Sequence, residues 1–293
     1  MKLKVGRHTI NISNEDKVLF GKSGITKAEL INYYITIAPI MMHYLDNRPI
    51  SLQRFPQGID HKGFFQKNAG DYFPDFVTRI AIPNKSDGTT NYVVIDKPAT
   101  LIYLANQDCI TPHIWLSKID NLELPDRMIF DLDPTDNLTF KDVQNVAKKL
   151  KDKLDDLNIP TFCMLTGSRG VHIVVPLKRI HTFDETRECA HSIAMQLANE
   201  FPTLITTTMH KADRKNRVFI DWLRNGFGST GVAPYAVRAH ENAPVAMPVT
   251  WEKLLSAPMH SQYYTINNAI HHINTVGDIW QSMHKHAISL KKI

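Results

Sequence analysis

The chain has 293 residues, of which 43% are hydrophobic and 22% are charged, and its formal net charge is +5. This length allows one large domain or two lobes, and the composition is that of an ordinary globular protein. No apolar run reaches the roughly 18 residues of a membrane helix, and we expect no signal peptide. The three cysteines lack metal-type spacing and predict a reduced cytosolic protein. The mild positive charge is compatible with a polyanionic partner but does not establish one.

The first predicted elements are a helix, a loop-rich segment and a buried strand. Residues 26–42 predict a helix, because Thr26 and Glu29 have the spacing of a capping box. Residues 47–97 are rich in Pro, Gly and aromatic side chains and predict loops and short strands. The apolar run MIFDLD, residues 128–133, predicts a buried strand that ends in two aspartates.

The second half of the chain alternates predicted helices and strands. Residues 139–157 form an amphipathic pattern and predict a helix. The elements that follow are a strand TFCML (161–165), a turn TGSRG (166–170), a strand VHIVVPL (171–177), a helix over 183–200 and a strand RVFIDWL (217–223). From Trp251 onward we expect a mostly helical end. Strands separated by helices indicate an α/β or α+β fold with polar residues at strand ends.

The aspartates of the D-L-D motif are the first candidate for chemistry. In a strand, residues two positions apart point to the same face, so Asp131 and Asp133 project together. Two neighbouring carboxylates repel each other unless a cation lies between them, and Mg²⁺ or Mn²⁺ suits oxygen ligands. The alternative is a strand-end turn in which Asp133 caps the next helix.

Two later stretches favour the metal interpretation. Asp221 also ends an apolar strand, and a third carboxylate could complete a two-metal site for phosphoryl transfer. In the turn TGSRGVH, Ser168, Arg169 and His172 are donors suited to phosphate, although a plain β-turn explains this turn equally well by itself. Together the three stretches predict a site for metal and polyphosphate.

A phosphatase remains an alternative. FDLDPT resembles the opening motif of haloacid-dehalogenase-type phosphatases, with Asp131 as nucleophile and Asp133 as acid/base. Thr166 could serve as their second motif. The chain has Pro134 where such motifs usually carry Gly, and VGDIW lacks the second acidic residue of their late motif.

The D-L-D motif, the S-x-x-x-H spacing and the lone Asp after an apolar run resemble the archaeo-eukaryotic primase superfamily. More closely, the chain resembles the polymerase domain of LigD, the bacterial end-joining repair protein. This resemblance runs from about Asn14 to about Trp280 and rests on the strings DKVLF, HKGFFQK, LANQ, DLDP, TGSRGVH, VFIDW and APYAVRA.

The resemblance implies a template-directed polymerase that fills gaps or extends 3′ ends in double-strand-break repair. Asp131, Asp133 and Asp221 would be the catalytic residues and would hold two Mn²⁺ or Mg²⁺ ions. Ribonucleotides would be preferred through a contact to the 2′-hydroxyl, for which Ser168 is a candidate.

The resemblance also assigns nucleotide-binding and DNA-binding positions. The nucleotide-binding residues would be Ser168, Arg169, His172, His113, Arg224, Arg238 and Phe64. The DNA-binding residues would be Lys17, Lys27, Asn14, Phe65 and Arg214, with the two lysines gripping a 5′-phosphate. Lys27 would lie in the first turn of its helix, where N–H groups also attract anions. Phe64 and Phe65 would stack on bases, but a strand would point them to opposite faces, so we expect one of them in the core. His240 stands where many relatives have a second Arg.

The expected fold is α+β, a primase-polymerase fold whose RRM-like catalytic sheet packs on an N-terminal α/β lobe. The lobe would cover about residues 1–124, the catalytic core about 125–245, and a C-terminal helical segment about 246–293 of one catalytic domain. Expected partners are gapped or 3′-overhang DNA with a 5′-phosphate, NTP or dNTP, a DNA ligase and a Ku-type end-binding protein. No membrane is expected, and the location would be the cytoplasm, in association with the nucleoid. A third hypothesis is a non-catalytic DNA-end-binding module, which the three carboxylates make unattractive.

Overall fold

The computed structural model describes residues 1–84 and 88–290, and the chain forms two compact units that we describe separately. Unit 1 consists of Met1–Asp120, Thr230–Ala246 and Tyr264–Gly277, and unit 2 of Asn121–Ser229, Met247–Tyr263 and Asp278–Ile293. Each unit is thus built from three separate segments of the chain. Among the described residues, no helix has both the length and the apolar character needed to cross a membrane.

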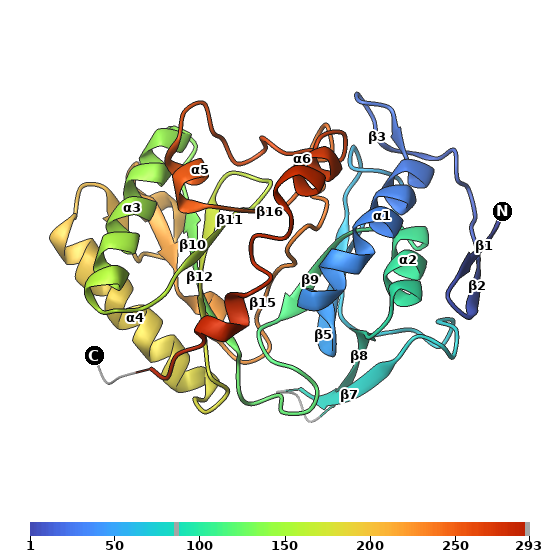
Figure 1. Ribbon diagram of the computed structural model, residues 1–293, viewed down its shortest axis with the longest axis horizontal. Coiled ribbons are helices and arrows are strands. Elements are labelled where there is room, and N and C mark those ends of the chain that lie inside the picture. The colour runs from blue at the N-terminus through green and yellow to red at the C-terminus, as the bar shows by residue number, and fades with distance from the viewer. Residues whose placement is uncertain (85–87, 291–293) are drawn as a thin grey trace. The chain divides into compact units, whose positions relative to one another are not determined.

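Unit 1 combines a large antiparallel sheet with two principal helices. Its elements are β1 (Lys2–Val5), β2 (His8–Asn11), β3 (Val18–Phe20), β4 (Ile25–Thr26), α1 (Lys27–Leu45), β5 (Arg48–Arg54), β6 (Phe64–Gln66), β7 (Arg79–Pro83), β8 (Thr89–Ile95), α2 (Pro98–Asn106), β9 (Cys109–Trp115), β15 (Thr230–Val232) and α6 (Ala269–Val276). The strand order of the large sheet is β15-β9-β5-β8-β7, with β6 paired to β5. Helices α1 and α2 pack against each other (Figure 1).

Helix α1 begins where the sequence predicts. The Thr26 hydroxyl accepts a hydrogen bond from the Glu29 N–H, and the Glu29 carboxylate accepts one from the Thr26 N–H. This capping box satisfies donors that the first turn leaves without helical partners. The helix runs three residues beyond the predicted end, to Leu45, with Pro39 inside it.

Unit 2 contains the predicted alternation of strands and helices. Its elements are β10 (Arg127–Asp133), α3 (Phe140–Asp156), β11 (Phe162–Leu165), β12 (Val171–Pro176), α4 (Phe183–Glu200), β13 (Ile205–Thr206), the 3₁₀ turn η1 (Lys211–Arg214), β14 (Val218–Asp221), the 3₁₀ turn η2 (Leu223–Asn225), β16 (Met247–Val249), α5 (Trp251–Leu255) and the 3₁₀ turn η3 (Met283–His286). Its sheet has the order β13-β14-β10-β12-β11-β16.

The centre of unit 2 has the β-α-β-β-α-β connectivity of an RRM-like sheet. Strands β14, β10, β12 and β11 are neighbours in that order, and each adjacent pair is antiparallel. Helices α3 and α4 lie on the same side of this sheet (Figure 1). The predicted α+β fold with an RRM-like sheet is therefore confirmed.

The two faces of β10 differ in polarity. Phe130 and Leu132 are fully buried, whereas the alternating Asp131 and Asp133 are only partly buried. Helix α3 is capped by Thr139, which forms a capping box with Asp142. The alternative in which Asp133 caps the next helix is therefore wrong.

The expectation of a mostly helical end is also wrong. After Trp251 the structure has the short helices α5 and α6 and the turn η3, joined by irregular segments. Backbone groups of these segments pair with distant residues: the Val245 N–H donates to the Tyr264 carbonyl, and the Ile288 N–H donates to the Pro176 carbonyl. Such long-range bonds replace helical ones and leave no local signal in the sequence.

Candidate functional site

Three polar side chains form a row across the sheet of unit 2. Asp131 on β10 is directly opposite Asp221 on β14 and His172 on β12. Residues opposite each other in antiparallel strands point to the same face, so all three side chains share one surface. The His172 Nε2 lies 3.6 Å from an Asp131 carboxylate oxygen. Residues that are 90 positions apart in the sequence are thereby brought within reach of one ligand.

Arg224 joins the two carboxylates of this row. Its Nε lies 3.2 Å from an oxygen of Asp131 and 3.3 Å from an oxygen of Asp221. Burial by itself would raise the pKa of Asp131, but His172 and Arg224 outweigh it and hold that pKa well below its usual range. Burial raises the pKa of Asp221 above its usual range, although Arg224 opposes the shift. The guanidinium therefore acts as the counter-ion of a carboxylate pair that would otherwise repel.

Asp133 has different partners. The Arg214 Nη1 donates to one of its oxygens at 2.8 Å, and the Arg169 Nη2 lies 3.4 Å from the other. Arg214 is almost fully buried, its guanidinium lies 4.1 Å from the centre of the Phe219 ring, and it also donates to the carbonyls of residues 208 and 209. The structure therefore places Arg214 among the supports of Asp133.

The position of Arg224 is fixed by its neighbour Asn225. The Asn225 side chain is fully buried, accepts a hydrogen bond from the Ile129 N–H and donates one to the Ile129 carbonyl, each at 2.8 Å. These two bonds replace those that a neighbouring strand would make with Ile129, because β14 ends before it reaches this residue of β10. Asn225 was missed by sequence reasoning, because this role depends on two segments 96 residues apart.

The turn from Thr166 to Gly170 lies against the end of β10. The Thr166 N–H and hydroxyl both donate to the Gly170 carbonyl, and Gly167 has a φ of +66°. A Cβ on Gly170 would lie 2.0 Å from the Leu132 carbonyl oxygen, so only glycine permits this approach. The close contact sets the turn beside the end of β10, where Arg169 lies 3.4 Å from an oxygen of Asp133.

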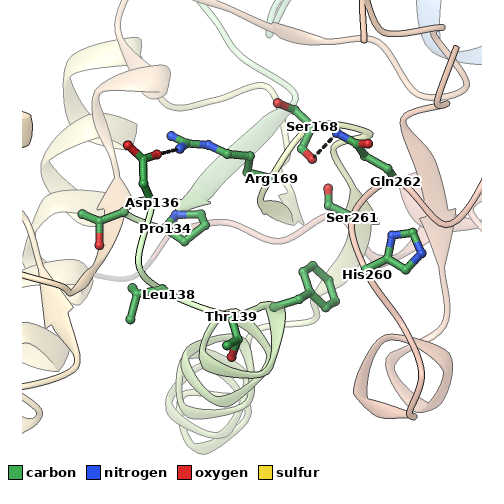
Figure 2. A pocket seen from close by; sticks show the side chains of 11 residues that line it. Pro134, Asp136, Leu138, Thr139, Ser168, Arg169, His260, Ser261 and Gln262 are labelled. Atoms are coloured by element: carbon green, nitrogen blue, oxygen red, sulfur yellow. Dashed lines mark hydrogen bonds and ion pairs between the residues drawn. The ribbon is translucent and has the colours of Figure 1, made fainter. Parts of the chain in front are cut away.

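A pocket of about 290 Å³ opens next to this turn. Figure 2 shows Ser168 and Arg169 at its rim, with Arg169 also paired to Asp136. Gln262 donates to the Ser168 carbonyl at 3.1 Å, and the Ser261 hydroxyl donates to the Gly170 carbonyl at 2.7 Å. The lining residues Asp136, His260, Ser261 and Gln262 were missed, because no motif links them to the turn in the sequence.

The carboxylates fit a hard divalent cation in ligand chemistry, but their side chains are occupied by arginines here. Within residues 1–84 and 88–290, no three His, Cys, Asp or Glu side chains are gathered tightly enough to form a ready-made metal site. Asp131 and Asp221 nevertheless share one positive charge, that of Arg224. Their oxygen atoms are the ligands that Mg²⁺ and Mn²⁺ prefer, so a metal ion could replace that guanidinium.

The predicted base-stacking residues belong to unit 1. Phe64 and Phe65 lie on β6, and their exposed fractions are 47% and 55%. The expectation that one of them lies in the core is wrong, since β6 is a short edge strand on β5 and both residues are exposed. The Phe65 ring makes an edge contact with His113 at 5.2 Å, and the Arg54 guanidinium lies 5.7 Å from the Phe64 ring centre. About half of each residue's surface is thus exposed to solvent, which leaves room for stacking.

The remaining predicted nucleotide contact, Arg238, is half-buried in unit 1. Its backbone N–H donates to the Pro244 carbonyl and so helps to close the segment that carries it. Asn14, also in unit 1, is exposed, has a φ of +48° and accepts a backbone hydrogen bond from the Lys17 N–H.

The two predicted phosphate-gripping lysines meet at a single carboxylate. The Lys17 and Lys27 Nζ atoms lie 2.6 Å and 3.0 Å from the same oxygen of Asp108. Lys27 is buried and also donates to the Asn106 carbonyl at 2.9 Å. Burial lowers the pKa of Lys27, while Asp108 opposes that shift. Sequence reasoning missed Asp108.

The first-turn N–H groups of α1 are not open to an anion. Those of residues 27 and 28 donate to backbone carbonyls of residues 17 and 15, and that of Glu29 donates to the Thr26 hydroxyl. The expectation that these groups attract a phosphate is therefore wrong, because each already has a partner. Phosphate binding in this region would depend on lysine side chains.

Comparison with known proteins identifies the family. The LigD primase-polymerase domain family matches residues 26–280. The polymerase domain of Mycobacterium tuberculosis ligase D, solved in complex with DNA, superposes with a TM-score of 0.88 at 30% identity and covers 95% of this chain and 99% of its own. This likeness confirms the predicted resemblance and does not favour the phosphatase alternative.

Two full-length relatives extend the comparison. The multifunctional non-homologous end joining protein LigD of Mycolicibacterium smegmatis is 31% identical over 92% of this chain, which spans 35% of that protein. The bifunctional LigD of Bacillus subtilis is 31% identical over 92% of this chain, which spans 43% of that protein. The chain thus corresponds to less than half of either relative, and it belongs to the LigD primase-polymerase domain family of nucleotidyltransferases.

Proposed function

We propose that the chain is a template-directed polymerase that fills short gaps and extends 3′ ends during the end joining of broken DNA. The observation that carries this proposal is the row Asp221–Asp131–His172 across three neighbouring strands, with the turn that holds Ser168 and Arg169 pressed against its edge. Carboxylates beside phosphate donors on one sheet face suit nucleotidyl transfer. Membership of the LigD family supports the same reaction.

A divalent metal is the expected cofactor of this family, and we propose that Asp131, Asp133 and Asp221 hold two such ions, Mn²⁺ or Mg²⁺. The ions would lower the pKa of the primer 3′-hydroxyl and neutralise the triphosphate. With metal bound, Arg224, which lies between Asp131 and Asp221 in the structure, would be free to bind a nucleotide phosphate. Arg214 keeps Asp133 fixed through its ion pair.

The incoming nucleotide would be held mainly by the turn and its pocket. The Arg169 guanidinium would provide a positive group for phosphates, and the pocket that it lines is large enough for part of a nucleotide. The buried His172 imidazole, beside Asp131, is proposed as a second phosphate donor. Ser168 is our candidate for a hydrogen bond to the ribose 2′-hydroxyl, which would give a preference for ribonucleotides. Phe64, His113 and Arg238 are the unit 1 residues proposed to contact the nucleotide.

DNA contacts would come from aromatic stacking and from the lysine pair. The exposed Phe65 ring is suited to a template base, since stacking tolerates every base. Lys17, Lys27 and Asn14 would bind the 5′-phosphate beyond a gap. Arg214 is proposed to act through Asp133.

The proposed partner proteins are a DNA ligase and a Ku-type end-binding protein, because end joining needs both ligation and end capture. The proposed location is the nucleoid, where the DNA lies.

Primer extension on gapped, 5′-phosphorylated DNA tests this function. The reaction contains Mn²⁺ and either ribo- or deoxyribonucleotides, and the control is the double variant Asp131→Ala/Asp133→Ala. We expect metal-dependent extension by the wild type, faster with ribonucleotides, and none by the control. Extension by the control at the wild-type rate would overturn the assignment of the carboxylates.

A further inference from the structure

The lysine pair of unit 1 already contains an anion, the Asp108 carboxylate. One of its oxygens lies 2.6 Å from the Lys17 Nζ and 3.0 Å from the Lys27 Nζ, which leaves neither ammonium group free of a counter-ion. The Lys17 ammonium also donates to the Pro56 carbonyl, and the Lys27 ammonium to the Asn106 carbonyl. One carboxylate offsets half of the charge of the two ammonium groups, so a phosphate that approached this pair would compete with that carboxylate.

The backbone conformation at Asp108 is one that costs free energy for a residue with a side chain. Asp108 has a φ of +60°, in the left-handed region that favours glycine. It lies in the turn between the end of α2 and the start of β9, where its N–H donates to the Ala105 carbonyl and its carbonyl accepts from the Phe55 N–H. Glycine would satisfy the same backbone bonds without strain, so the side chain is the distinctive feature of this position.

The two lysines differ in their access to solvent. The Lys17 side chain is 24% exposed and the Asp108 side chain 12%, whereas the Lys27 side chain is only 2% exposed. An incoming phosphate therefore reaches Lys17 first, and it reaches the buried Lys27 only after it displaces the carboxylate. A terminal phosphate carries a charge of about −1.5 to −2 at neutral pH and can replace a single carboxylate charge.

We propose that Asp108 is an internal competitor of the DNA 5′-phosphate and sets the affinity and selectivity of this site. This inference rests on the proposed contact of Lys17 and Lys27 with a 5′-phosphate. The carboxylate keeps Lys27 ionised and ordered when DNA is absent, and it is exchanged for the terminal phosphate when DNA binds. Removal of its charge strengthens binding of phosphorylated ends more than binding of hydroxyl ends, since the terminal phosphate bears the larger charge.

Binding of fluorescent gapped DNA, with and without the downstream 5′-phosphate, tests the competition at one fixed salt concentration. The test variant is Asp108→Asn, which removes the charge and tolerates a positive φ. Asp108→Gly is the second variant and serves if Asp108→Asn folds poorly. It also removes the charge, and it relieves the backbone strain. Asp16→Asn is the matched control, since the exposed Asp16 adjoins Lys17 in sequence and its substitution changes net charge by the same amount.

The measured quantity is the dissociation constant for hydroxyl-ended DNA divided by that for phosphorylated DNA. We expect this ratio to rise about fivefold or more in both Asp108 variants. Asp16→Asn should tighten binding of both DNAs equally and leave the ratio unchanged. The double variant Lys17→Ala/Asp108→Asn should lose most of the gain. Phosphorylated DNA should also raise the melting temperature of Asp108→Asn more than that of the wild type, because the phosphate restores the missing counter-ion of Lys27.

Two different failures can be told apart. If the wild type prefers phosphorylated DNA and Lys17→Ala abolishes that preference, while neither Asp108 variant changes the ratio, Asp108 is only a structural partner of Lys27. If the wild type and every variant bind both DNAs equally, the lysine pair is not a phosphate site, and the inference fails with it. Extension of a primer on a template without a downstream strand reports the polymerase function separately from both outcomes.

Discussion

The carboxylate row of unit 2 and the lysine pair of unit 1 each contain one opposite charge from the same chain, and these two counter-ions differ in exposure. Arg224, which covers Asp131 and Asp221, is 43% exposed. Asp108, which lies against Lys17 and Lys27, is 12% exposed, and its partner Lys27 is only 2% exposed. An exposed counter-ion is replaced at little cost because water screens the charges it leaves, whereas a buried charge must receive a new partner at once. Exchange should therefore be easy at the first site, whereas at the second it requires a ligand whose charge can replace that of the carboxylate.

The largest effect should come from removal of a central carboxylate in the exchangeable site. In Asp131→Ala, primer extension should fall by about a thousandfold, because several kcal/mol of transition-state stabilisation by bound cations are lost. The matched control is Asp156→Ala, which removes an exposed carboxylate at the end of α3. Steady-state extension rates check the prediction, and equal losses in the two variants would contradict it.

The next largest effect should come from removal of Asn225, the neighbour that positions Arg224, and it should appear in the stability of the fold. Asn225→Ala leaves the N–H and carbonyl of Ile129 without their buried partners. We expect the free energy of unfolding to fall by about 2 to 4 kcal/mol. Urea denaturation measures this loss, with the exposed Asn199→Ala in α4 as a control that should change it by less than about 0.5 kcal/mol. An unchanged midpoint for Asn225→Ala would remove its positioning role.

The difference in burial between Lys27 and Lys17 can be tested by comparing how much each lysine contributes to the free energy of unfolding. Lys27→Met removes a buried ammonium and should lower the free energy of unfolding by about 2 kcal/mol, since Asp108 loses its innermost partner. Lys17→Met should cost less than about 1 kcal/mol, because this pair is partly solvated. Denaturant titrations of both variants provide the measurement. If the two losses were equal, the difference in burial between Lys17 and Lys27 would have no energetic consequence, contrary to the account of this site.

The smallest effect should come from Arg224 itself. In Arg224→Gln the carboxylates lose their intramolecular cation, so the Mn²⁺ concentration for half-maximal extension should fall about fivefold, equivalent to about 1 kcal/mol. The KM for the nucleotide should rise if the freed guanidinium binds a phosphate. Arg187→Gln, an exposed arginine on α4, is the control for charge alone. A higher Mn²⁺ requirement in Arg224→Gln would contradict the exchange.

The sequence predicted those features that depend on local periodicity. The alternation in MIFDLD is enough to place Asp131 and Asp133 on one face, and the capping-box spacing of Thr26 and Glu29 locates the start of α1. The family resemblance pointed to the RRM-like sheet. These elements are determined by contacts between residues a few positions apart.

The features that sequence reasoning missed depend on pairing between distant segments. The direct opposition of Asp131 and Asp221 follows from the register of β10 and β14, and the role of Asp108 follows from a turn that meets two other segments. Phe64 and Phe65 are both exposed because β6 ends at an uncovered edge, which a rule of strand alternation does not predict. No periodicity within one segment reports which charges will meet.

The most direct test of the central claim is a Mn²⁺ titration of primer extension by the wild type and by Asp221→Asn. Asparagine keeps the oxygen that accepts the Leu223 N–H, so the fold is preserved while the charge opposite Asp131 is lost. The account predicts extension that rises and saturates with Mn²⁺ in the wild type and stays at the metal-free level in the variant. Superimposable titrations of the two proteins would contradict it.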